Sequence, residues 1–121
     1  MVLVDTSVWV SHFRHKNLRL EDLLSRDLVY CHPFVIGELA CGHLNHRDEI
    51  LNLLQELPVA IAATDQDVLL FIEKHRLMGK GLAIVDIHLL ASAALSGLFI
   101  WTEDKVMSYI ARQLGIQYQI S

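Results

Sequence analysis

Short apolar runs alternate with longer amphipathic stretches along the 121 residues of this chain. A continuous apolar run of four or five residues with polar neighbours is typical of a strand covered on both faces of a sheet. This pattern predicts strands at Met1–Val4, Leu28–Cys31, Val59–Ala62 and Leu98–Trp101, and an edge strand at Gln117–Ile120.

The segments between these runs carry apolar residues at helical spacing. Thr6 or Ser7 can cap the first helix, Pro58 stops the fourth, and glycines follow several of the others. The pattern predicts helices at 6–13, 18–24, 33–42, 47–57, 64–78, 85–95 and 104–114. Strands that alternate with helices predict a single α/β domain over residues 1–121, with a mostly parallel central sheet between two layers of helices.

Composition narrows the class of protein further. Hydrophobic residues make up 53% of the chain and the mean hydropathy is +0.36, which allows a full core and excludes disorder. The apolar surplus indicates a surface that a partner or a second copy covers. The net charge of −4 gives no overall nucleic-acid footprint, although a local basic surface remains open.

The expected location is the cytoplasm, with no membrane segment. Cys31 and Cys41 make no disulfide framework and are interpreted as reduced thiols. No signal peptide opens the chain. The apolar stretch 82–101 is interrupted by Asp86, His88 and Gly97, so a helix followed by a strand explains it better than a membrane span.

Acidic residues occur inside or at the end of four segments that look like core. They are Asp5, Glu38, Asp86 and Asp104. Asp5 and Asp104 follow predicted strands, while Glu38 and Asp86 lie on predicted helices, so all four can reach one edge of the sheet. Carboxylates that converge need a counter-ion, and a divalent cation is the simplest one. The set therefore predicts a metal-dependent enzyme.

Each acid also has an ordinary explanation. Asp5 could cap the next helix, and Asp86 could serve the dipole of its own helix. Glu38 could lie on a solvated face, and Asp104 could belong to a charged surface turn. The prediction depends on all four occurring together at matching positions in the topology.

Four blocks of sequence carry a resemblance to a known family. They are Val2–Trp9 (VLVDTSVW), Ile36–Leu39 (IGEL) with Gly42 after it, Ile84–Ala93 (IVDIHLLASA) and Leu98–Lys105 (LFIWTEDK). Together they resemble the PIN-domain ribonucleases, specifically the VapC-like toxins of prokaryotic toxin–antitoxin pairs. The resemblance covers the whole chain. Val106 is a departure, since some relatives carry a further acid there, and this leaves one metal against two open.

The resemblance implies that Asp5, Glu38, Asp86 and Asp104 form the family's acidic quartet. It also implies that Ser7 and Thr102 are supporting hydroxyls. The expected reaction is hydrolysis of RNA phosphodiesters with Mg²⁺ or Mn²⁺, leaving 5′-phosphate and 3′-hydroxyl ends. Asp5 and Asp86 are expected to hold the principal metal, while Glu38 and Asp104 complete the shell, orient water or hold a second ion.

RNA and a cognate antitoxin are the partners that this resemblance implies. An acidic pocket needs cations along the approach of a polyanion. The candidates are Arg14, Lys16, Arg19, Lys80 and Lys105. A groove for the antitoxin is expected from apolar residues on two predicted helices, and a homodimer from the same apolar excess. The groove residues are Leu18, Leu20, Leu24, Ile50, Leu51 and Leu54.

Other interpretations remain open at this stage. Trp9 and Trp101 could stack bases, although core positions suit them better. Cys41, His43 and His46 lack a fourth zinc ligand. A phospho-acceptor signalling domain is a second class of function, but it would need two adjacent acids after the first strand. A non-catalytic RNA-binding module is the third, and it would fit best if one of the acids were missing.

Overall fold

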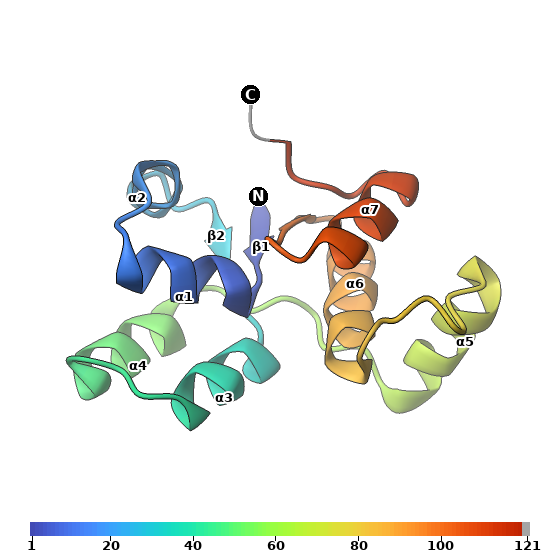
Figure 1. The fold of residues 1–121 in the computed structure, drawn as a ribbon, viewed down its shortest axis with the longest axis horizontal. Coiled ribbons are helices and arrows are strands. Elements are labelled where there is room, and N and C mark those ends of the chain that lie inside the picture. Colours follow the sequence, from blue (N-terminus) through green and yellow to red (C-terminus); the bar gives the residue numbers. More distant parts are fainter. Residues whose placement is uncertain (120–121) are drawn as a thin grey trace.

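The computed structural model describes residues 1–119, which form a small parallel sheet between two layers of helices (Figure 1). The strands are β1 (Val2–Val4), β2 (Val29–Tyr30) and β3 (Phe99–Trp101), in the order β2-β1-β3. Val2 pairs with Val29 on one side and with Phe99 on the other. Single parallel bridges, Cys31 to Val59 and Ile100 to Gln117, extend the sheet at both edges.

The helices follow the sequence prediction closely. Figure 1 shows α1 to α4 on one side of the strands and α5 to α7 on the other. This arrangement confirms the predicted α/β fold with helices on both faces of the sheet. The bounds are α1 (Thr6–Arg14), α2 (Leu18–Ser25), α3 (Pro33–Cys41), α4 (Arg47–Glu56), α5 (Asp65–His75), α6 (Ile84–Ser96) and α7 (Lys105–Gln113).

The central strand anchors the core. Leu3 and Val4 of β1 are fully buried, as are Ile100 of β3 and Leu89 and Leu90 of α6. At ~25 cal/mol per Å² of apolar area, these contacts are the main favourable term that fixes β1 between the two helical layers. The carboxyl end of β1 is therefore a rigid point in the molecule, and Asp5 comes directly after it.

Several predicted boundaries differ from the structure. Arg76 adopts a left-handed conformation with φ 52°, so α5 ends at His75 and not at Met78. The predicted strands at 59–62 and 117–120 are reduced to single bridges at Val59 and Gln117, and Ile120 lies outside the described residues. Edge segments pair on one side only, so an apolar run overestimates their length.

The first helix is capped differently from the prediction. Asp5 is the N-cap residue of α1 and makes no side-chain cap hydrogen bond. Thr6 and Ser7, predicted as caps, are the first two helical residues, and their hydroxyls donate to carboxylates instead. That prediction was wrong because the helix begins at Thr6, so both residues lie inside its first turn and Asp5 takes the N-cap position.

None of the helices in residues 1–119 has the length and apolar character needed to cross a bilayer. The apolar stretch at 82–101 forms α6 and β3. Cys31 is fully buried and Cys41 is exposed, and both are free thiols. Burial raises the pKa of the Cys31 thiol to about 11, so this thiol stays protonated and unreactive at neutral pH.

Candidate active site

Asp5 is held at the carboxyl end of the central strand by two hydroxyl groups. Its backbone N–H donates to the Trp101 carbonyl at 2.9 Å, which ties it to the end of β3. Its Oδ2 accepts hydrogen bonds from Ser7 Oγ at 2.8 Å and from Thr102 Oγ1 at 2.7 Å. The residue is only 7% exposed. Two hydroxyl donors compensate for the lost hydration of a buried carboxylate and fix its orientation.

The same hydroxyls position the loop that follows β3. The Ser7 and Thr102 oxygens lie 3.3 Å apart. The Glu103 N–H donates to Ser7 Oγ at 3.0 Å, and the Asp104 N–H donates to Thr102 Oγ1 at 3.1 Å. Ser7 and Thr102 therefore link Asp5 on β1 to the residue before α7, which is Asp104.

Glu38 is joined to the first helix by a residue whose role the sequence did not reveal. Thr6 Oγ1 donates to Glu38 Oε1 at 2.6 Å, and Glu38 lies exposed on α3. The two residues are 32 positions apart, so neither periodicity nor a local motif could pair them. Thr6 directly follows Asp5 in the sequence, and this position was the only signal that could have indicated a role in the site.

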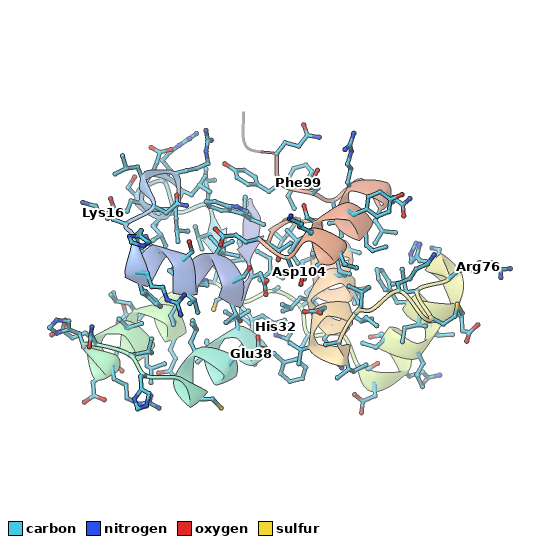
Figure 2. The ribbon with its side chains drawn as sticks, in the orientation of Figure 1. Lys16, His32, Glu38, Arg76, Phe99 and Asp104 are labelled. Atoms are coloured by element: carbon cyan, nitrogen blue, oxygen red, sulfur yellow. The ribbon has the colours of Figure 1, made fainter. Side chains whose placement is uncertain are left out.

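The carboxyl of Asp86 is affected by the charges of the other three acids. Burial raises the pKa of its carboxyl, and the charges of Asp5, Asp104 and Glu38 raise it further, while a hydrogen bond from the Ala83 N–H opposes the shift. Like charges raise a carboxyl pKa only when they are close enough to interact. In Figure 2, Glu38 and Asp104 lie near the middle of the molecule, whereas Lys16 and Arg76 lie toward opposite ends.

Each of the four carboxylates accepts hydrogen bonds through one of its two oxygens. Asp86 Oδ2 accepts from Ala83 N–H at 3.0 Å, and Asp104 Oδ1 caps α7 by accepting from Met107 N–H at 2.8 Å. The donors to Asp5 and Glu38 also take one oxygen each. The second oxygen of every carboxylate accepts none of these hydrogen bonds.

The four acids supply oxygen donors alone. Within residues 1–119, no three Asp, Glu, His or Cys side chains lie close enough together to form a metal-binding group. Mg²⁺ keeps several waters and needs only one or two direct carboxylate ligands. Four carboxylates around one region, without a soft Cys or His ligand among them, match Mg²⁺ or Mn²⁺ chemistry.

A buried histidine joins the two helices that carry Glu38 and Asp86. His32 precedes α3, and its Nδ1 accepts from the Phe34 N–H at 3.0 Å. Its Nε2 lies 3.1 Å from Ser92 Oγ on α6. Because Nδ1 is an acceptor, the neutral ring carries its proton on Nε2 and donates to Ser92. His88, the other buried imidazole, lies edge-on to Phe34 and 3.8 Å from Asp65, so it is packed as expected.

The structure predicts a loss of stability at mildly acidic pH. Burial, helped by the charge of His88, lowers the His32 pKa below its ordinary value of 6.5. The unfolded chain therefore takes up this proton first, and stability falls as pH drops from about 6.5 to the folded-state pKa. His32→Asn keeps a helix-capping oxygen but cannot titrate. Its melting temperature should fall less than that of the wild type between pH 7.5 and 5.5, and an equal fall would contradict this role.

The five candidate cations are scattered. Arg14 and Lys16 lie at the far end of α1, about 13 Å along the helix from Asp5. Lys16 pairs with Glu21 at 3.5 Å, and Arg19 donates to the Tyr118 hydroxyl at 3.3 Å. Lys80 is exposed in the loop before α6, and Lys105 is the first residue of α7, directly after Asp104. Of the five, only Lys105 adjoins an acid of the site in sequence.

The aromatic and thiol alternatives find no support in the described residues. Trp9 and Trp101 are each 4% exposed and belong to the core, so neither presents a free face to a base. Cys41, His43 and His46 are exposed and form no metal-binding group within residues 1–119. Val106, where an additional acid was considered, is an exposed residue of α7.

Comparisons with known proteins show the family and the fold of this chain. The PIN domain family matches residues 2–113. Ribonuclease VapC32 of Mycobacterium tuberculosis, in strains CDC 1551 / Oshkosh and H37Rv, is 44% identical over 117 residues, which cover 96% of this chain and 94% of the relative. Two solved structures share the fold. PAE2754 from Pyrobaculum aerophilum superposes with a TM-score of 0.61 at 17% identity, covering 90% of this chain and 78% of that one. FitAcB from Neisseria gonorrhoeae superposes with a TM-score of 0.60 at 19% identity, covering 93% of this chain and 94% of that one.

Proposed function

Since this chain belongs to the PIN domain family and, within it, to the VapC ribonucleases, we propose that it is an endoribonuclease toxin that cleaves RNA phosphodiester bonds. The observation that carries the proposal is the buried Asp5 carboxylate, which the Ser7 and Thr102 hydroxyls hold at the end of β1. Thr102 also accepts from the Asp104 N–H. Four carboxylates at one sheet edge repel one another and a polyanionic substrate alike. A divalent cation removes both repulsions.

The residues of the site divide the work. Asp5 and Asp86 would hold the principal Mg²⁺ or Mn²⁺ through the oxygens that their hydrogen-bond donors leave unused. Glu38 and Asp104, which are more exposed, would complete the shell through water. When bound, the metal lowers the pKa of a coordinated water and makes hydroxide available near neutral pH. Ser7 and Thr102 keep the Asp5 carboxylate oriented throughout.

Metal dependence is tested with the purified chain and a fluorogenic RNA. We expect cleavage with Mg²⁺ or Mn²⁺, complete loss of cleavage in EDTA, and recovery when the metal is returned in excess. Asp5→Asn should be inactive under all three conditions, which guards against a contaminating nuclease. Equal cleavage in EDTA and in Mg²⁺ would refute the metal site, and absence of cleavage in every metal tested would refute the nuclease.

We propose that an antitoxin docks on an apolar hollow of about 480 Å³ between α1, α2 and α4. Leu24, Ile50 and Leu54 of the groove expected from sequence line it, whereas Leu20 is fully buried and Leu18 and Leu51 are not among its lining residues. The other lining residues are Trp9, His12, Phe13, Leu53 and Leu57. The Trp9 indole N–H is buried without a hydrogen-bond partner among the described residues.

A homodimer is the second assembly that we propose. Leu69 and Leu70 of α5 and Leu95 of α6 are exposed on two helices that pack together. A face of this kind is typical of an interface between copies. Light scattering of the purified toxin should give twice 13.7 kDa, and a monomer at every concentration would exclude the dimer. The free thiols and the RNA substrate favour action in the cytoplasm, which cell fractionation would test.

A further inference from the structure

A hollow of about 430 Å³ opens directly beside the acidic site. Thr102, whose hydroxyl donates to Asp5, is one of its lining residues. The others come from β3, α7 and the segment that follows α7: Trp101, Ser108, Arg112, Gln117, Tyr118 and Gln119. Its volume falls within the range of about 300–1,000 Å³ that is usual for ligand pockets.

A second hollow, of about 540 Å³, shares four lining residues with the first: Arg112, Gln117, Tyr118 and Gln119. The second hollow also reaches Phe99, at the amino end of β3, whereas Thr102 follows the carboxyl end of the same strand. The lining residues of the two hollows therefore follow β3 along its length. We call the surface that they line the β3 path.

The floor of the β3 path is fixed by backbone hydrogen bonds. The Ile100 N–H donates to the Ile116 carbonyl at 2.7 Å, and the Tyr118 N–H donates to the Ile100 carbonyl at 2.8 Å. Gln117 Nε2 donates to Ser108 Oγ at 2.6 Å. The Tyr118 ring packs on Trp101 with 5.3 Å between centroids. An aromatic ring and an amide are thus held in place before any ligand arrives.

The charge along the β3 path is positive, although the whole chain carries −4. Arg112 lines both hollows, and Arg26 lines the second. None of the described residues that line either hollow is acidic. Arg112 makes no ion pair within residues 1–119, whereas Arg26 pairs with the exposed Asp22 at 3.4 Å. Arg19 lines neither hollow and donates to the Tyr118 hydroxyl.

We propose that the β3 path binds the single-stranded RNA segment adjoining the scissile phosphate, with Arg112 contacting a backbone phosphate and Tyr118 carrying a base. This inference rests on the proposed function and names the route of its substrate. Single-stranded RNA is recognised by cations that follow the backbone and by aromatic rings on which splayed bases stack. A guanidinium, a fixed tyrosine and side-chain amides occur here together, next to the acids.

The test is RNA binding by the full chain in EDTA, which separates affinity from cleavage. The probe is a fluorescein-labelled single-stranded RNA 12-mer of mixed sequence, followed by anisotropy. Arg112→Gln should weaken binding about five- to tenfold and reduce the slope of log affinity against log salt by about 0.7, the value for one lost phosphate contact on a single strand. Tyr118→Leu should weaken binding about tenfold, while Tyr118→Phe, which keeps the ring, should stay within about twofold of the wild type.

Arg76→Gln is the matched control, because it removes the same charge far from the site (Figure 2). Its backbone has φ 52° and both side chains are unbranched at Cβ, so the strain is unchanged. Binding by Arg112→Gln and Tyr118→Leu at the level of Arg76→Gln would overturn the β3 path, as would a wild-type chain that does not bind the RNA. If the wild type still cleaves RNA with Mg²⁺ while Asp5→Asn does not, such a result contradicts only the proposed RNA route. The proposed ribonuclease activity is then unaffected.

Discussion

Asp86→Asn should lose at least about 100-fold of the ribonuclease activity and still leave the metal-free protein at least as stable as the wild type at pH 7. Loss of an outer partner of a metal ligand already costs about 10–100-fold, so loss of a ligand should cost more. The stability follows from the raised pKa of Asp86. A carboxyl whose folded-state pKa is raised destabilises the fold above that pKa, and this cost disappears as pH falls through it.

The Asp86→Asn substitution keeps the hydrogen bond at the start of α6. The Asn side-chain oxygen can still accept from the Ala83 N–H, so the start of α6 keeps its hydrogen bond. Asp48→Asn, on the exposed first turn of α4, is the control for the change of charge and should keep full activity. Cleavage is followed with a fluorogenic RNA and stability by thermal unfolding in EDTA. Activity within threefold of the wild type would remove Asp86 from the site.

The fold was predictable because its signals are local. Each buried strand is an apolar run next to a turn residue, and each helix has its own periodicity and stop, as with Gly97 after α6. The segments that failed were those that depend on neighbours. Val59 and Gln117 pair at one residue only, and α5 ends where Arg76 turns left-handed, which no local signal marks.

The elements that carry the four acids were predictable, but the contacts of the acids were not. Topology predicts that Asp5, Glu38, Asp86 and Asp104 reach one edge of the sheet, and their role as a metal site stays a prediction. The argument from buried acids holds for Asp5 alone, since Glu38 and Asp104 are exposed in the structure. Such exposure suits side chains that must meet a hydrated ion and a large substrate.

Long-range partners escaped the sequence for a physical reason. The hydrogen bond from Thr6 to Glu38 and the hollow beside Thr102 depend on how helices pack, which periodicity does not encode. Arg112 was missed because a cation in the last turn of a helix is already explained by the helix dipole. Only its place among the lining residues of both hollows distinguishes Arg112 from other helix-end cations.

Leu53→Glu should abolish neutralisation by the antitoxin while leaving RNA cleavage within about twofold of the wild type. Leu53 lines the apolar hollow between α1, α2 and α4, and its side chain is 63% exposed in the free protein. A glutamate there is solvated before binding, so the fold tolerates it. A docked partner would bury that charge without a counter-ion, a penalty of several kcal/mol. At 1.4 kcal/mol per factor of ten, affinity should fall by about 100-fold or more.

Leu69→Glu is the matched comparison, since Leu69 is 64% exposed and lies on α5, away from the hollow. It should bind the cognate antitoxin with unchanged affinity per protomer, and it should lower the molar mass if α5 and α6 form the dimer. Affinity is measured by calorimetry and neutralisation by growth of cells that express both proteins. Equal affinity of the two variants for the antitoxin would place the antitoxin elsewhere, because the same charge on two equally exposed leucines can be told apart only by what covers them.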